Sequence, residues 1–214
     1  LQKAAEVYAR QDRLDEANED VRGIRAEVHY RRAIPLLDES QQSDGRLEFL
    51  KPGLLHLRLG KPRNEEVYSN GERWWIISHN DKQVEIYEAA EDEAAAAEAS
   101  FITFGYGEGS QKLVRSYRIE LLATDRPEPE DEDAQPVTVY RLRFTPRDKD
   151  APARFAMIET DIADDLWLPQ TIVLHESDGE IVHTFELREI DLNPKLDEDD
   201  FDYRPRRGYT VLRP

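Results

Sequence analysis

The chain has 214 residues, of which 35% are charged, no cysteine and a formal net charge of −17. A negative charge of this size argues against binding to nucleic acid or to anionic membrane surfaces. The lack of cysteine excludes disulfides and thiol nucleophiles, and no apolar run approaches the ~20 residues that cross a bilayer, so an integral membrane protein is not expected. The length suits one large β domain, and we expect residues 1–214 to form a single domain.

The first part of the chain predicts a helix, a long strand and a turn. Residues 1–20 place apolar side chains on roughly one side of a helix, which we expect Gly23 to end. Residues 24–37 then alternate apolar and charged side chains with a period of two, which is typical of a strand. The polar residues 38–44 are expected to form a turn.

Residues 46–88 predict an antiparallel meander of short strands. Asn70-Gly71 is a strong hairpin signal, because both central positions of a type I′ turn need positive φ. The connections are also too short for parallel strands. Alternation within the strands predicts one apolar face, and a filled β core is the alternative to a cavity there. The residues expected to line the cavity are Leu47, Phe49, Leu55, Leu57, Trp75, Ile77, Val84 and Ile86. Trp75 is preferred over Trp74 because it shares the two-residue register of Ile77.

The character of the sequence changes after residue 88. Acidic residues followed by an alanine run favour a helix, both by propensity and by the helix dipole. The far end of this stretch is apolar, with Phe101, Ile102 and Phe104. A helix that fills the core is one interpretation, and a lid over an apolar cavity is the other.

The C-terminal half predicts further strands. Residues 126–136 are rich in proline and acidic residues, which indicates a solvated loop. The stretches with strand composition are 117–123, 137–144, 154–162, 170–176, 180–191 and 209–212. About eleven strands in one antiparallel run favour an α+β fold that is mainly antiparallel β, with a single curved sheet or incomplete β-barrel.

No catalytic, metal or cofactor site is predicted. The five histidines are scattered without the spacing of metal ligands. Glu159 is the one carboxylate in a markedly apolar setting, and the Asp197, Asp199, Asp200 group lacks the glycine and terminal glutamate of an EF-hand loop. We therefore expect a protein that is not an enzyme.

The order of the elements resembles the periplasmic lipoprotein carriers of the LolA/LolB fold. The resemblance is carried by GRLEFLKPG (45–53), SNGERWWI (69–76), KQVEIYE (82–88) and the closing pattern over residues 165–212. It covers nearly the whole chain. It rests on the order and spacing of strands and turns, since no single motif is specific.

This resemblance implies an incomplete β-barrel whose concave apolar face is covered by helices and shelters the acyl chains of lipoproteins during transit across the periplasm. It implies an inner-membrane donor, an outer-membrane acceptor and a monomeric carrier, with a signal peptide removed before Leu1. In many carriers an arginine precedes the meander's proline and latches the lid. Lys51 holds that position here, and an ammonium cannot make the forked contacts of a guanidinium.

Three other functions remain open at the level of sequence. The first is a lipid-sensing regulatory module of the same fold, similar to RseB. A hydrolase built on a curved sheet is the second. The third is a membrane-anchored receptor version of the fold, which a lipidated cysteine before Leu1 would indicate.

Overall fold

The computed structural model describes residues 19–88, 117–127, 136–147, 155–204 and 206–213. These residues form strands joined by turns, with two short 3₁₀ helices, η1 (Pro35–Leu37) and η2 (Glu198–Phe201). The strands are β1 (Gly23–Ile34), β2 (Glu39–Leu50), β3 (Leu54–Leu59), β4 (Glu65–Asn70), β5 (Arg73–Ser78), β6 (Gln83–Glu88), β7 (Tyr117–Asp125), β8 (Val139–Pro146), β9 (Phe155–Ala163), β10 (Leu168–Glu176), β11 (Val182–Leu192) and β12 (Thr210–Leu212).

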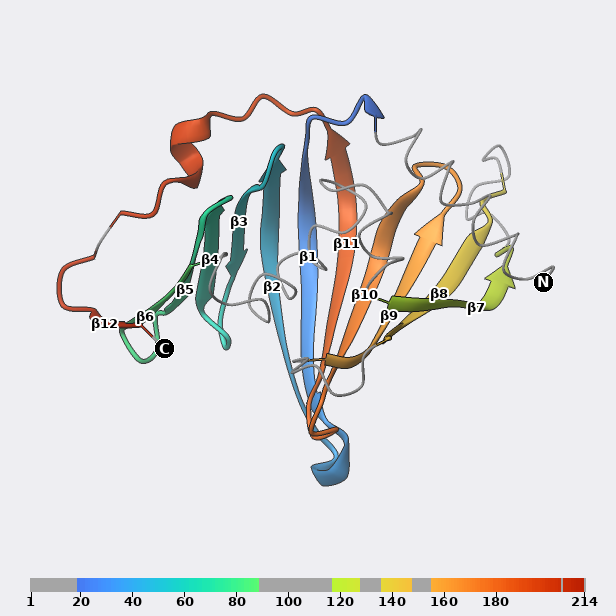
Figure 1. Ribbon diagram of the computed structural model, residues 1–214, viewed down its shortest axis with the longest axis horizontal. Coiled ribbons are helices and arrows are strands. Elements are labelled where there is room, and N and C mark those ends of the chain that lie inside the picture. Colours follow the sequence, from blue (N-terminus) through green and yellow to red (C-terminus); the bar gives the residue numbers. More distant parts are fainter. Residues whose placement is uncertain (1–18, 89–116, 128–135, 148–154, 205, 214) are drawn as a thin grey trace.

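All twelve strands belong to one open sheet in the order β12-β6-β5-β4-β3-β2-β1-β11-β10-β9-β8-β7. β1 lies in the middle, because it pairs with β2 on one side and with β11 on the other. Every pairing is antiparallel except that of β12 with β6. The sheet is strongly bent and both its ends are strands rather than a closed ring (Figure 1). The predicted mainly antiparallel, incomplete barrel is confirmed; helices that would cover its face lie outside the described residues.

The predicted turn at residues 38–44 is wrong. β2 already begins at Glu39, and the reversal is made by η1, with Asp38 in the left-handed region at φ 53°. β1 and β2 pair from Gly23 opposite Leu50 to Ile34 opposite Glu39. The ladder bonds of the backbone do not depend on side-chain polarity, and this end of the hairpin is exposed, so polar residues occupy strand positions there.

Gly45, inside β2, marks a close approach of the β2 and β3 backbones. A Cβ atom built on Gly45 would lie 2.1 Å from the carbonyl oxygen of Arg58, the residue next to its register partner Leu59. No side chain fits at such a distance, so only glycine allows the two backbones to approach this closely. Glycine inside a strand is typical of corners in curved sheets and barrels.

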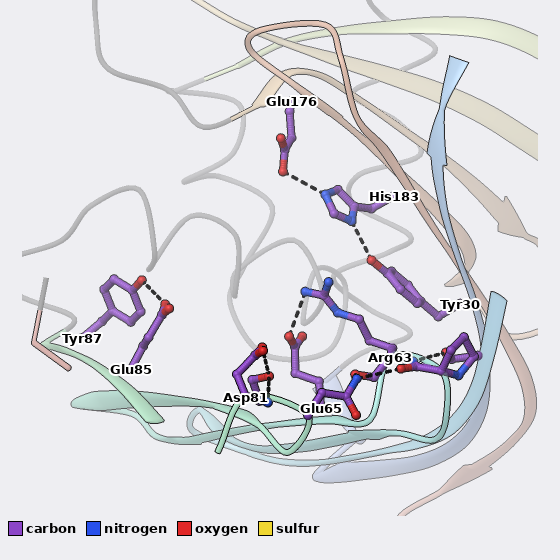
Figure 2. Close-up of polar contacts among 12 residues, drawn as sticks. Tyr30, Arg63, Glu65, Asp81, Glu85, Tyr87, Glu176 and His183 are labelled. Atoms are coloured by element: carbon purple, nitrogen blue, oxygen red, sulfur yellow. Dashed lines mark hydrogen bonds and ion pairs between the residues drawn. The ribbon is translucent and has the colours of Figure 1, made fainter. Parts of the chain in front are cut away.

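The main hydrophobic core lies on one face of the sheet. Register pairing places Ile24, Phe49 and Leu55 side by side on β1, β2 and β3, and all three are buried. The same face continues through β11, β10, β9 and β8 to β7 at the far edge. Side chains of this face point into the space that the bent sheet encloses, as Figure 2 shows for Tyr30 on β1 and Glu65 on β4. We call it the concave face and the other the convex face.

Candidate functional site

Four of the eight predicted lining residues lie together on the concave face. Leu47 pairs with Leu57, and Phe49 pairs with Leu55. Their side chains belong to one core cluster that extends across the sheet, which we call the concave wall: Ile24, Ala26, Val28, Leu47, Phe49, Leu55, Leu57, Leu59, Leu142, Phe144, Ile158, Ile162, Ile172, Leu174, Phe185 and Leu187. A continuous apolar surface of this kind suits acyl chains or other hydrocarbon groups.

The other four predicted lining residues lie on the convex face, so the prediction that all eight share one face is wrong. The register of β4 with β5 pairs Ser69 with Trp74 and Val67 with Ile76, which places Trp74 and Ile76 on the concave side. The side chains on the convex side of β5 and β6 are therefore those of Trp75, Ile77, Val84 and Ile86.

A small second core explains why these four residues are apolar. The C-terminal segment leaves β11, forms η2, which packs against β3 and β4, and ends as β12 beside β6 (Figure 1). Phe201 in this segment is 1% exposed, and the ring of Tyr203 stacks on Trp75 with centroids 5.8 Å apart. The convex side of β5 is thus covered by the C-terminal segment, while Trp74 packs against the core on its concave side. Apolar side chains on both faces of a strand give an apolar run without alternation in the sequence, and Trp74 to Ile77 form such a run.

A buried carboxylate, Glu66, fastens the C-terminal segment to the convex face. It is 5% exposed. It accepts hydrogen bonds from Tyr68 Oη at 2.8 Å and His79 Nε2 at 2.9 Å. Arg206 Nη2 donates to both of its oxygens at 3.0 and 3.1 Å. Nothing in the alternation of β4 distinguished this glutamate from a solvated one.

Its neighbours hold the pKa of Glu66 well below its usual range. The largest cause is the imidazole of His56, whose Nε2 lies 3.6 Å from Oε2. The hydrogen bonds from Tyr68 and His79 and the charge of Arg206 lower the pKa further, and burial opposes them. Burial and the adjacent carboxylate also raise the pKa of Tyr68 to about 12. Glu66 is therefore an ionised anchor that holds Arg206 of the C-terminal segment by charge-assisted hydrogen bonds.

A polar chain interrupts the concave face near the β1–β2 hairpin. Tyr30 and His183 come from neighbouring strands at the centre of the sheet, and the Tyr30 hydroxyl lies 2.8 Å from His183 Nδ1. His183 Nε2 lies 2.9 Å from a carboxylate oxygen of Glu176, near the end of β10 (Figure 2). Each ring nitrogen of His183 therefore has a hydrogen-bonding partner.

The predicted lid lies outside the described residues, and so do Phe101, Ile102 and Phe104. Lys51 lies in the turn between β2 and β3, where its backbone N–H donates to the carbonyl of Arg22 at 2.8 Å. Burial lowers the pKa of its side chain. Latching of a lid by Lys51 therefore stays a prediction.

Other candidate groups have structural partners. Glu159 accepts from Arg143 Nη2 at 2.7 Å, and Asp197 caps η2 by accepting from the backbone N–H of Asp199. Within the described ranges, no group of three or more His, Asp or Glu side chains is placed to hold a metal ion. The same ranges contain no helix that is long and apolar enough to span a bilayer.

Comparison with solved structures shows similarity of fold. An uncharacterized conserved protein from Thermus thermophilus aligns over 98% of this chain and 99% of its own, with a TM-score of 0.58 and 14% identity. MucB aligns over 97% of this chain and 66% of its own, with a TM-score of 0.50 and 18% identity. A LolA superfamily protein from Nitrosomonas europaea aligns over 92% of this chain and 97% of its own, with a TM-score of 0.45 and 11% identity.

Among curated proteins no match is found. The family model described as outer membrane lipoprotein carrier protein LolA matches residues 35–204, which span η1, the whole meander, the C-terminal strands up to β11, and η2. This chain therefore belongs to the LolA family of outer membrane lipoprotein carrier proteins.

Proposed function

We propose that the protein carries the acyl chains of lipoproteins or related lipids across the periplasm, on the concave wall and without catalysis. One observation carries the proposal: the apolar concave wall extends over the inner face of the open sheet from β8 to β3, while the outer face of the same strands bears ion pairs such as Arg25–Glu48 and Arg141–Asp161. In such a sheet the inner face can contact hydrocarbon chains, while the charged outer face contacts water. The function rests on family membership together with this surface.

A carrier needs to bind acyl chains and also release them. Burial of one CH₂ group contributes about 0.8 kcal/mol, so a chain of ~16 carbons gains roughly 13 kcal/mol when fully buried. Two or three such chains would exceed the limit of reversible binding. The wall residues are already buried in this structure, Leu55 and Ile24 completely. An incoming chain therefore exchanges existing apolar contacts for new ones, and the net gain comes mainly from its own dehydration.

The transport cycle that we propose follows the family. An inner-membrane donor delivers the acylated molecule, the monomeric protein shelters the chains in the periplasm, and an outer-membrane acceptor removes them. Phe101, Ile102 and Phe104 act as the lid in this scheme, with Lys51 at the latch position. The lid side chains would cover the wall when it is empty and yield to lipid on loading.

The function is tested by lipid uptake of the purified protein. A synthetic triacylated lipopeptide and the same peptide without acyl chains are offered, and the bound mass is read by native mass spectrometry. We expect a one-to-one complex with the lipopeptide alone, and a monomeric mass for the free protein. Equal binding of the peptide without acyl chains, or no uptake of any acylated compound, would contradict a carrier that acts through the concave wall.

A further inference from the structure

Polarity changes along the central strands of the concave face. At the end of β1 next to Leu50, the wall begins with Ile24 and continues through Val28, and both are buried. Toward η1 the same face carries Tyr30 and then Arg32, which is half-exposed. β11 repeats the change, since the position opposite Arg32 is His183 instead of leucine or phenylalanine. The concave face thus has an apolar end at Ile24 and a polar end next to η1.

The polar end is an ordered chain of hydrogen bonds. Glu176, His183 and Tyr30 are linked by contacts of 2.9 and 2.8 Å across β10, β11 and β1. With the Nε2 proton directed at the Glu176 carboxylate, His183 Nδ1 is an acceptor for the Tyr30 hydroxyl. Ser43, opposite Tyr30 on β2, is also buried and accepts from the backbone N–H of Arg63 at 3.0 Å. Polar groups therefore cross the concave face from β10 to the β3–β4 turn.

Arg32 and Arg63 are two cations at this end, and Arg63 is paired with Glu65 at 2.8 Å. Arg32 projects from the concave side of β1, since it alternates with Tyr30 and pairs with His183. In the described part of the chain no carboxylate forms an ion pair with it. Its neighbour Arg31 has the same side chain but points to the convex side, opposite Thr184 and Gln42, and is exposed. The side chains of Arg32 and Arg31 thus project from opposite faces of the sheet.

We propose that the end of the concave face next to η1 binds the polar head of an acylated ligand, with Arg32 donating hydrogen bonds to its oxygen atoms. The inference rests on the proposed carrier function and adds an orientation to it: head toward η1, acyl chains toward Ile24. The reverse orientation would press polar head atoms against the buried apolar side chains of Ile24, Phe49 and Leu55, which offer no hydrogen bonds in place of those to water. The ligand class is an acylated molecule whose head carries carbonyl or phosphate oxygens, which suit the guanidinium fork.

The orientation is tested with two photoreactive lipopeptides that differ only in the position of a diazirine. One carries it in the head next to the first amide, and the other at the end of an acyl chain. After native mass spectrometry has shown uptake, the cross-linked peptides are mapped. We expect the head probe to label the segments around Arg32 and His183, and the tail probe to label those around Ile24, Phe49 and Leu55. Tail labelling around Arg32 overturns the orientation while leaving the carrier function intact; failure of both probes to bind overturns the carrier function and the orientation together.

The role of Arg32 is tested against its neighbour. Arg32→Gln and Arg31→Gln are compared for binding of the triacylated lipopeptide, of phosphatidylglycerol with the same acyl chains, and of hexadecane, which has no head. Loss of one charge-assisted hydrogen bond is expected to weaken binding of a head-bearing ligand about tenfold in Arg32→Gln and not in Arg31→Gln. Hexadecane should bind both variants like the parent protein. A loss confined to one head-bearing ligand identifies carbonyl or phosphate as the recognised group.

Two results would overturn the assignment of Arg32. In the first, the two glutamine variants bind all three ligands alike. In the second, hexadecane binding falls as far as lipopeptide binding in Arg32→Gln, which would indicate a change in the wall and no contact with the head. Thermal unfolding of both variants gives the control for folding, since neither arginine has an ion-pair partner among the described residues.

Discussion

The side chains of Trp74 and Trp75, adjacent in β5, project from opposite faces of the sheet. The side chain of Trp74 packs against the core of the concave face. That of Trp75 stacks on Tyr203 of the C-terminal segment, on the convex face. Two adjacent residues therefore contact different parts of the protein: Trp74 the core of the concave face, and Trp75 the C-terminal segment.

This separation predicts a difference in fluorescence quenching. The chain has three tryptophans, so variants with a single tryptophan are made by replacing the other two with phenylalanine. A lipopeptide with brominated acyl chains should quench Trp74 strongly and Trp75 weakly, because heavy-atom quenching needs contact. The unbrominated lipopeptide is the control. Equal quenching of both residues would mean that lipid does not occupy the concave face alone.

Glu66→Gln should release the C-terminal segment. The amide keeps the shape of the side chain but loses the charge that faces Arg206 and His79, and leaves Arg206 without its carboxylate. Removal of one partner from a buried, bonded charge cluster costs about 2–4 kcal/mol of unfolding free energy. Hydrogen exchange should rise first in β12. Glu48→Gln, which breaks a more exposed pair with Arg25, is the matched control and should cost under ~1 kcal/mol.

The same carboxylate predicts a dependence of stability on acid. The pKa of Glu66 is lowered in the folded protein from an ordinary value of 4.5. Its contribution is therefore fully present above about pH 4.5 and is lost as the pH falls from there toward the folded-state pKa. In urea unfolding at pH 7, 5, 4 and 3.5, the stability advantage of the parent protein over Glu66→Gln should shrink below pH 4.5. A constant advantage across this range would show that the charge of Glu66 does not stabilise the fold.

Gly45→Ala should weaken the pairing of β2 with β3. The added methyl group would meet the backbone oxygen of Arg58, which cannot move without parting β2 from β3. We expect a loss of about 2–4 kcal/mol in unfolding free energy. Gly179→Ala is the control: the turn glycine has φ +74° and open space around it, so only backbone strain of about 1 kcal/mol is expected. Chemical denaturation of both variants distinguishes a steric clash from strain.

The lid proposal predicts a separation of binding from stability. Phe101 and Phe104 are replaced together by serine. If they cover the wall only in the lipid-free protein, lipopeptide retention should change at least tenfold, because each buried phenylalanine contributes about 1.5–3 kcal/mol of apolar contact. The midpoint of thermal unfolding should stay close to that of the parent protein. A parallel collapse of the unfolding midpoint would instead identify both side chains as ordinary core.

Local sequence signals were sufficient for the strands and their direction. A period of two and short turns such as Asn70-Gly71 dictate antiparallel pairing of neighbours, since a parallel crossover does not fit in so few residues. The same signals carried the family resemblance. The prediction of a turn failed at residues 39–44. This end of the hairpin is exposed to solvent, so its strand positions can be polar, and a polar stretch has the composition of a turn.

The facing of the strands was decided only by the tertiary structure. Alternation states that adjacent side chains take opposite faces, but the choice of face depends on the register with the next strand, and a shift of one residue exchanges the two. In β5 and β6 the alternation did not show which side chains face the concave side, because the convex side also carries apolar residues. The C-terminal segment, more than a hundred residues away in the sequence, covers that side. Pairing of Ser69 with Trp74 and stacking of Tyr203 on Trp75 settle it. Such contacts depend on residues that are distant in the chain, and no local pattern encodes them.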